Sequence, residues 1–461
     1  MTPSYHEQLA AYFTSRRWFA GKGRSFTITH VHAMPWLTSE QPRARIEIVT
    51  VEFEDGTQES YQFPVAYLPE PDARWSHALV GPVEHDELGL TTAYDAVYLK
   101  PAADAFLRAF HERHDDGALS FHVVDSAELP GDEVFGTVMT AEQSNTSIAY
   151  GDDAILKLFR RVSAGGNPDI EIHEALTHAG AEHVAPLLGW ISGVWSRPDG
   201  EPAHGHLGML QLYLRTATDG WDLALASVRD LLIEEDLHPD EVGGDFASEA
   251  ERLGEATASV HAHLAEIFGP GTLTAEQQAA LAESMYERLR KARVIVPEID
   301  VYADGLERHF ERLRALASAV AVQRIHGDLH LGQTLRTVKG WKLIDFEGEP
   351  AKSLTERAAM DSTLRDVAGM MRSFGYAAGA TLKQFGENEQ LSYRADEWVA
   401  RNRDAFLQGY FGDPAEGDAR RALLLAYEAD KAVYEAVYET RNRPSWVAIP
   451  LQAIHRLAVE S

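Results

Sequence analysis

The sequence predicts an α+β protein in which a smaller part of mixed strands and helices precedes a larger, mostly helical part. Two strand-length segments of alternating apolar and polar residues, 44–53 and 59–65, lie near the N-terminus. From about residue 211 the apolar residues instead recur every three to four positions, which is the period of a helix. A short β-rich stretch at 322–344 interrupts these helices, so we expect a small sheet inside the helical part.

Two subdomains are predicted in the N-terminal part. The first, 1–88, begins with a helix at 6–13, and an Asp55-Gly56 turn joins its two strands, as is typical of a β-hairpin. The second, 89–210, is predicted to be rich in strands. Its expected elements are a helix at 102–113, a hairpin at 147–159, a helix from 170, and strands at 184–194 and 206–214.

The C-terminal part, 211–461, is predicted to form a single helical subdomain. Helices are expected at 219–232, 245–267 and 275–294, and again after the β-rich stretch. No run approaches the roughly 18 apolar residues of a membrane-spanning helix. We therefore expect no membrane association.

Composition excludes several classes of function. Of the 461 residues, 42 are Lys or Arg and 71 are Asp or Glu, which gives a formal net charge of −29. This charge repels phosphate backbones and anionic membranes, so neither nucleic acids nor bilayers are expected partners. The chain has no cysteine, which excludes disulfides, thiolate zinc sites and cysteine nucleophiles. The absence of cysteine and of a secretory signal favours a cytoplasmic protein.

The strongest motif is QRIHGDLHLGQ at 323–333, which WKLIDFE follows at 341–347. Transfer of a phosphoryl group needs a carboxylate that accepts the proton of the acceptor hydroxyl, and oxygen ligands that hold Mg²⁺. Gln333 lies five residues after Asp328, and Asp345 follows an apolar Leu-Ile pair. Protein kinases arrange a base, an amide ligand and an acidic ligand in this order. The spacing therefore predicts Asp328 as the base and Gln333 and Asp345 as Mg²⁺ ligands.

A nucleotide-binding half is expected upstream of this motif. Lys157 ends the strand sequence AILK, which is typical of a lysine that contacts ATP phosphates. Glu171 in the next helix is its predicted partner, and Glu174, one turn later, is the alternative. No glycine-rich loop precedes the lysine. The segment 142–147 stands in its place, and its Ser144, Asn145 and Thr146 could meet phosphate oxygens.

A helix near the C-terminus predicts a sugar site. Tyr427, Lys431, Tyr434 and Tyr438 recur at steps of four, three and four residues, so they share one face, and Glu435 flanks them. Aromatic rings stack on sugars, and charged side chains bond their hydroxyls. We interpret Lys431, Tyr434, Glu435 and Tyr438 as acceptor-binding residues. A tyrosine-lined packing face is the alternative interpretation.

Over nearly its whole length the chain resembles the bacterial maltokinases, within the aminoglycoside phosphotransferase-like branch of the protein-kinase fold. The motifs that carry the resemblance are RRWFAGKGR at 16–24, SNTSIAYGDDAILKLFRR at 144–161, NPDIE at 167–171, DGW at 219–221, QRIHGDLHLGQTLR at 323–336, LIDFEGEP at 343–350, DSTLRDVAGMMRSFGYAA at 361–378 and DKAVYEAVYETRNRP at 430–444. The resemblance implies a bilobal kinase-like fold with an extra N-terminal cap subdomain and a mostly helical C-lobe.

The resemblance also implies a reaction and the roles of individual residues. The γ-phosphoryl group of ATP would move to the anomeric hydroxyl of maltose and give maltose 1-phosphate for α-glucan synthesis. Lys157 would hold the ATP phosphates and Glu171 would fix Lys157, while Gln211 and Tyr213 would lie at the hinge that binds adenine. Arg365, Asp366 and Arg372 are expected to brace the catalytic loop.

Other functions stay open at this point. A kinase of another sugar, such as glucosamine, or of an aminoglycoside is the first alternative, because the excess of acids suits a cationic acceptor. A non-catalytic kinase-like binding subunit is a second alternative, from another class. Maltokinases also occur with a trehalose synthase, which is therefore a candidate partner.

Overall fold

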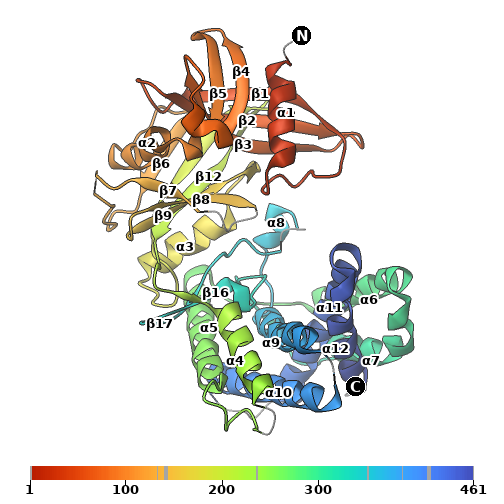
Figure 1. Cartoon of the computed structure of the whole chain (residues 1–461). Coiled ribbons are helices and arrows are strands. Elements are labelled where there is room, and N and C mark those ends of the chain that lie inside the picture. The colour runs from red at the N-terminus through yellow and green to blue at the C-terminus, as the bar shows by residue number, and fades with distance from the viewer. Residues whose placement is uncertain are drawn as a thin grey trace. The chain divides into compact units, whose positions relative to one another are not determined.

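The computed structural model describes residues 3–131, 133–139, 144–234, 237–349, 352–386, 388–412 and 417–459. The chain divides into two compact units (Figure 1). The first comprises Met1–Thr177 and Ala185–Arg215, and the second comprises His178–Val184 and Thr216–Ser461. The first unit mixes strands and helices and the second is mostly helical, as the sequence predicts. The division of the first unit at residue 88 stays a prediction.

An antiparallel sheet forms the N-terminal region of the first unit, in the order β1-β2-β3-β5-β4. Its strands are β1 (Phe26–Trp36), β2 (Arg43–Phe53), β3 (Gln58–Leu68), β4 (Leu79–His85) and β5 (Gly89–Asp95), and the short β10 (Arg161–Val162) pairs with β3. The helix α1 (Tyr5–Ser15) begins with a capping box of Ser4 and Glu7. It buries Leu9 and Phe13 in the core of this sheet.

A second antiparallel sheet follows, in the order β6-β11-β12-β9-β8-β7. Its strands are β6 (Leu119–Val123), β7 (Gly136–Val138), β8 (Asn145–Tyr150), β9 (Ala154–Phe159), β11 (Leu187–Ser196) and β12 (Pro202–Leu212). The helix α2 (Lys100–His111) packs Phe106 and Phe110 into the hydrophobic core that it shares with this sheet. The helix α3 (Pro168–His178) and the short 3₁₀ helices η1 (Ala73–Ala78) and η2 (Ala96–Tyr98) complete the elements of this half.

The second unit is built around the helix α9 (Leu364–Phe385), which packs against α4, α10 and α11. Its other helices are α4 (Gly220–Ile233), α5 (Ala247–Phe268), α6 (Ala275–Ile295), α7 (Ala303–Arg314), α8 (Leu354–Arg357), α10 (Glu389–Phe411), α11 (Asp418–Asn442) and α12 (Ala448–Val459), with 3₁₀ helices η3 (Pro297–Tyr302), η4 (Leu331–Gln333) and η5 (Pro444–Trp446). Two small sheets, β13-β16-β17 and β14-β15, complete it. Their strands are β13 (Thr218–Asp219), β14 (Gly271–Thr272), β15 (Ala321–Val322), β16 (Thr334–Thr337) and β17 (Gly340–Leu343).

The predicted β-rich stretch at 322–344 contains β16 and β17. The loop 323–333, which holds the strongest motif, separates these two strands from β15. The sequence did not predict β1, β4 and β5. Strand β1 shows no regular alternation of buried and exposed residues, and the short β4 and β5 contain glycine and proline, which weaken a strand pattern. No helix in the described part of the chain is long and apolar enough to cross a membrane.

Candidate active site

One buried carboxylate, that of Asp366, fixes the start of the loop 323–333. Asp366, in the first turn of α9, accepts hydrogen bonds from the backbone N–H of His326 at 2.8 Å and of Gly327 at 2.9 Å, and it contacts His261 Nε2 at 3.0 Å. Gly327 has a φ of +86°, a conformation that glycine adopts without strain. Asp366 therefore fixes the backbone that immediately precedes Asp328, and it confirms the predicted bracing role.

Close packing of α9 against the loop fixes its remaining backbone. A Cβ atom at Gly369 would lie 2.4 Å from the carbonyl oxygen of Leu329, so only glycine allows this approach. Four residues later in α9, the Ser373 hydroxyl accepts a hydrogen bond from the backbone N–H of Leu331 at 3.0 Å. The loop thus rests on a rigid, buried helix, which suits a catalytic segment that must hold its geometry.

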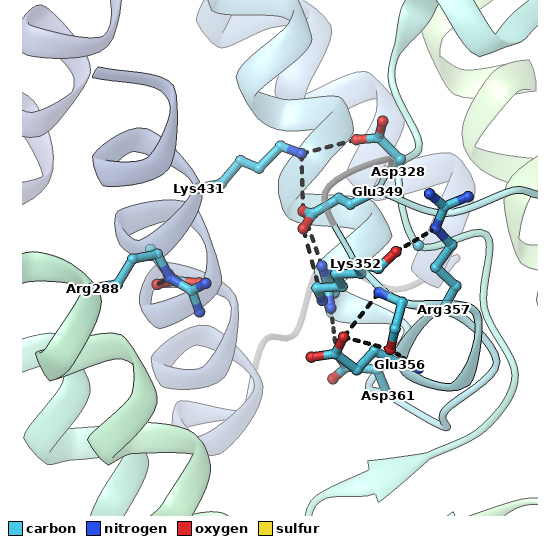
Figure 2. Close-up of polar contacts among 12 residues, drawn as sticks. Arg288, Asp328, Glu349, Lys352, Glu356, Arg357, Asp361 and Lys431 are labelled. Atoms are coloured by element: carbon cyan, nitrogen blue, oxygen red, sulfur yellow. Dashed lines mark hydrogen bonds and ion pairs between the residues drawn. The ribbon is translucent and has the colours of Figure 1, made fainter. Parts of the chain in front are cut away.

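Asp328 forms an ion pair with Lys431 of α11, at 3.0 Å between Oδ1 and Nζ (Figure 2). Lys431 Nζ also lies 3.5 Å from Glu349 Oε1. Burial raises the pKa of Asp328, but the Lys431 ammonium and His330 lower it by more, so the net pKa is below its ordinary value. Asp328 is therefore an ionised carboxylate at neutral pH, as a group that accepts a proton or a hydroxyl hydrogen bond must be.

Glu349 links this pair to a second cluster of charges (Figure 2). It lies 2.9 Å from Arg365, which also binds Asp361 at 2.8 Å, and Asp361 accepts a hydrogen bond from the Tyr427 hydroxyl at 2.5 Å. Burial raises the pKa of Glu349, but Arg365, Lys431 and Lys352 lower it to about 2. Because Arg365 binds Glu349 and Asp361, it braces the surroundings of Asp328 rather than the loop itself.

These groups line a cavity of about 170 Å³ within the second unit. Asp328, Glu349, Lys431 and Tyr434 form one part of its wall, and α6 forms another. The α6 residues in the lining, Leu281, Ser284, Met285 and Arg288, recur at helical spacing and so share one face of α6. Arg288 is held there by Asp430, at 2.6 Å between Nε and Oδ1. Arg288 is drawn apart from the Asp328 cluster in Figure 2.

Gln333 and Asp345, the predicted Mg²⁺ ligands, lie together. The Gln333 side-chain amide donates to Asp345 Oδ2 at 3.1 Å. Asp345 has a φ of +68°, in the left-handed region that non-glycine residues adopt mainly as Asp or Asn. Asp345 lies two residues after the end of β17. An amide oxygen and a carboxylate are hard ligands that suit Mg²⁺, so the two residues fit the predicted ion.

The structure places Lys157 on β9 of the first unit. Its ammonium donates to Asp169 Oδ2 in α3 at 3.3 Å, so Asp169 is a partner that the sequence reasoning did not consider. Glu171 and Glu174 lie in the same helix, and their predicted pairing with Lys157 stays a prediction. Across the hairpin Lys157 is opposite Ser147, and Phe159 is opposite Asn145.

One residue of the predicted phosphate-binding segment, Thr146, differs from expectation. Thr146 is opposite Leu158, so it lies on the other face of the hairpin from Lys157. There its hydroxyl accepts a hydrogen bond from Arg160 Nε at 2.8 Å. The expected role of Thr146 as a phosphate contact is therefore corrected. Ser144 precedes β8, while Glu142 and Gln143 of the same predicted loop lie outside the described residues.

The predicted hinge segment lies at the end of β12, with Gln211 among its last paired residues and Tyr213 directly after the strand. Gln211 is opposite Ile155 of β9 and so lies on the same sheet face as Lys157. The backbone N–H of Leu212 donates to Pro186 and that of Tyr213 donates to Asp153, both at 3.0 Å. These two N–H groups already have acceptors within the chain, which leaves carbonyl groups and side chains for an adenine.

The three glutamates of α11 are engaged in ion pairs. Arg372 of α9 binds Glu435 at 2.7 Å, Arg403 of α10 binds Glu428 at 2.8 Å, and Arg443 binds Glu439 at 2.6 Å. Glu435, a predicted acceptor contact, therefore serves to join α11 to α9. For the acids of this helix the packing interpretation is the better one.

The tyrosines of α11 fit the predicted sugar-binding face more closely. The rings of Tyr434 and Tyr438 stack at 6.4 Å between centroids, with 24° between their planes. Tyr438 is 43% exposed, and Tyr434 also lines the cavity. The two rings therefore form an aromatic surface that continues from the cavity wall.

Sequence reasoning missed Glu349, Asp361 and Arg288 as members of this site. Glu349 lies in the LIDFEGEP motif, four residues after the predicted metal ligand Asp345, and this proximity could have indicated it. Arg288 gave no such signal. It is one of many arginines on an amphipathic helix, and only the tertiary structure brings it to Asp430.

Two known families match the chain. The family described as the maltokinase N-terminal cap domain matches residues 12–98, and the phosphotransferase enzyme family matches residues 237–424. The second match contains the loop 323–333 with Asp328 and Gln333, and also Asp345. The first match ends within η2, just after β5.

Relatives and solved structures agree with these families. A glucosamine kinase of Streptacidiphilus jiangxiensis is 30% identical over 329 residues, which cover 67% of this chain and 70% of the relative. A glucosamine kinase of Mycolicibacterium smegmatis is 27% identical and covers 70% of this chain and 79% of its own. A solved structure of a glucosamine kinase with glucosamine, ADP and inorganic phosphate covers 99% of this chain and 100% of its own, with a TM-score of 0.69 and 22% identity. This likeness confirms the kinase-like fold with its cap and its helical C-terminal region. The chain belongs to the phosphotransferase enzyme family, as a kinase of the sugar-phosphorylating kind with a maltokinase-type N-terminal cap domain.

Proposed function

We propose that the protein transfers the γ-phosphoryl group of ATP to a neutral sugar, maltose, at its anomeric hydroxyl. The observation that carries this proposal is that the carboxylates lining the cavity already have partners. Each of those that line it (Asp328, Glu349, Asp361, Asp366 and Asp430) already has a cationic or hydrogen-bonding partner. The hydroxyls of a neutral sugar can donate to the carboxylates and accept from their cationic partners, whereas the ammonium of an amino sugar can only donate and would be repelled by Lys431 and Arg365.

In this proposal Asp328 accepts the hydrogen bond of the attacking hydroxyl and takes its proton as the sugar oxygen bonds to the γ-phosphorus, while the bond from that phosphorus to the β,γ-bridging oxygen breaks and ADP leaves. Lys431 keeps Asp328 ionised and donates to a neighbouring oxygen of the sugar. Tyr434 and Tyr438 offer their faces to the sugar rings. Positioning of this kind is the main contribution that a protein makes to phosphoryl transfer.

The nucleotide is assigned to two sets of residues. Lys157 would hold the phosphates, and Asn145 and Ser147 lie on the same face of the hairpin. Gln333 and Asp345 would hold Mg²⁺, which when bound neutralises the charge that develops on the phosphate oxygens. The presence of ADP in the solved glucosamine kinase structure supports ATP as the donor.

Glucosamine is the second candidate acceptor, because the two relatives described above bear the name glucosamine kinase. One assay separates the candidates. ATP consumption with Mg²⁺ is measured with maltose, glucosamine, glucose and an aminoglycoside, and ³¹P NMR identifies the phosphorylated position. We expect the highest kcat/KM with maltose and an anomeric phosphate product. A higher kcat/KM with glucosamine would reject the proposed acceptor and keep the kinase activity.

Replacing Lys431 with Met is expected to move the acid limb of the pH–rate profile to higher pH. Asp328 works in its ionised form, and Lys431 lowers the pKa of that carboxyl against the effect of burial. Without the ammonium, burial dominates and the pKa of Asp328 rises, so activity is lost at a higher pH as the solution is acidified. The profile of kcat/KM against pH measures the shift.

The loss of a hydrogen bond from a charged group should also lower kcat/KM for maltose by about 10- to 100-fold. Lys352→Met is the matched control. Lys352 contacts Glu349 at 3.7 Å, so this substitution removes the same charge from the cavity without changing a contact of Asp328. Equal shifts in the two variants would show that Lys431 acts only through overall charge.

Replacing Arg288 with Met is expected to raise the KM for maltose by about tenfold or more, since a hydrogen bond to a charged group contributes on the order of 1.5–3 kcal/mol. Arg288 lies in the α6 wall, so it would contact the part of the acceptor that does not react. The KM for ATP should not change. Arg290→Met is the control on the same helix, because Arg290 pairs with the exposed Glu283. If the KM for maltose and the KM for ATP rise equally in Arg288→Met, Arg288 is not an acceptor-binding residue.

A further inference from the structure

The strand β9 is followed, three residues after Lys157, by a buried arginine. Arg160 pairs with Asp95 at 3.0 and 3.2 Å through one guanidinium nitrogen, and neither side chain is exposed to solvent. An ion pair of this kind loses the hydration of both charges, and apolar residues of similar volume often give equal or greater stability. Stability alone therefore does not explain why charged residues occupy these positions.

Arg160 is bound almost entirely by the N-terminal cap region. Asp95 lies at the end of β5, and the Tyr12 hydroxyl of α1 donates to it at 3.2 Å. The ring of Trp18, in the RRWFAGKGR motif, lies 4.8 Å from the guanidinium carbon. The backbone N–H of Gln62 in β3 donates to the Arg160 carbonyl at 2.7 Å. Three separate segments of the cap thus meet at Arg160, and a fourth, α1, reaches it through Asp95.

The same guanidinium reaches the hairpin that carries Lys157. Arg160 Nε donates to the Thr146 hydroxyl at 2.8 Å, and Thr146 is the second residue of β8. In the hairpin Thr146 is adjacent to Ser147, which is opposite Lys157. A change in the orientation of Arg160 would therefore alter the start of β8, beside the residues that face the same side as Lys157.

We propose that Arg160 is a positioning residue through which the cap domain fixes the β8–β9 hairpin for the phosphates of the nucleotide. The inference rests on the proposed nucleotide site, and it gives the cap a role in nucleotide affinity. Thr146 acts from the face opposite Lys157, so its effect on the nucleotide is transmitted through the backbone of β8.

The variant Thr146→Val tests this with little disturbance, because it keeps the shape of the side chain and removes only the acceptor of the Arg160 bond. We expect a rise of about fivefold in the Kd for Mg·ADP, measured by isothermal titration calorimetry of the full chain, and a similar rise in the KM for ATP. The KM for the acceptor should stay close to that of the unaltered protein, and the melting temperature should fall by only a few degrees, because Arg160 Nε loses one buried acceptor.

Asp95→Asn should weaken Mg·ADP binding further, since it leaves the Arg160 charge without its counter-ion. Arg161→Gln is the matched control. Arg161 is the next residue, but its pair with Glu59 at 2.9 Å is half exposed, and this variant should bind Mg·ADP as the unaltered protein does.

Three outcomes overturn the inference. If Thr146→Val binds Mg·ADP like the unaltered protein, Arg160 does not position the hairpin. If acceptor KM and ATP KM rise equally, the bond has only a general structural role. If the unaltered protein binds no Mg·ADP, the proposed function itself fails, and the inference fails with it.

Discussion

Replacing Asp328 with Asn is expected to lower kcat by roughly 10²- to 10⁴-fold, the contribution typical of a positioned general base. Asn has nearly the same shape as Asp, so the contacts that fix the loop backbone through Asp366 remain. What is lost is the negative charge that accepts the hydroxyl proton. The measurement is steady-state turnover at saturating ATP and acceptor, together with the Kd for Mg·ADP.

The binding measurement separates a chemical from a structural effect. We expect the Kd for Mg·ADP to stay within about twofold, because Asp328 belongs to the acceptor cavity and has no assigned contact with the nucleotide. Asp361→Asn, which changes another carboxylate of the same cavity, is the control and should reduce kcat far less. Turnover of Asp328→Asn within a few-fold of the unaltered protein would reject Asp328 as the base.

The proximity of Gln333 and Asp345 was predictable because the two residues are close in the sequence. Gln333 precedes β16 and Asp345 follows β17, so the short hairpin brings the two side chains together. The roles of Asp328, Gln333 and Asp345 stay predictions. The ion pair between Asp328 and Lys431 is different. The sequence identified both residues, but their contact spans 103 positions and depends on the packing of α11 against α9.

Errors arose where a run of neighbouring residues received a single role. Ser144, Asn145 and Thr146 were assigned to phosphate together, yet successive residues of a strand point to opposite faces. Thr146 accordingly binds Arg160 on the other face. Glu435 shows the helical counterpart of this error. Its position on α11 suits a sugar contact, but Arg372 of α9 occupies it, and no local pattern reveals such a partner.

Replacing Asp345 with Asn is expected to abolish most of the stimulation by Mg²⁺ and to lower kcat by on the order of 100-fold or more, because a metal ion supplies several kcal/mol of charge stabilisation in the transition state. Asn is the informative substitution here. Asp345 has a φ of +68°, which Asn adopts readily, whereas Ala would add backbone strain.

Mg²⁺ titrations of the Kd for ADP and of kcat provide the measurement. In the unaltered protein both quantities should depend steeply on Mg²⁺, and chelation of the ion should remove activity. In Asp345→Asn the dependence should be weak, while the melting temperature without Mg²⁺ stays unchanged. An unaltered Mg²⁺ dependence in the variant would place the ion elsewhere, since Gln333 alone offers one neutral oxygen and cannot hold a dication against a triphosphate.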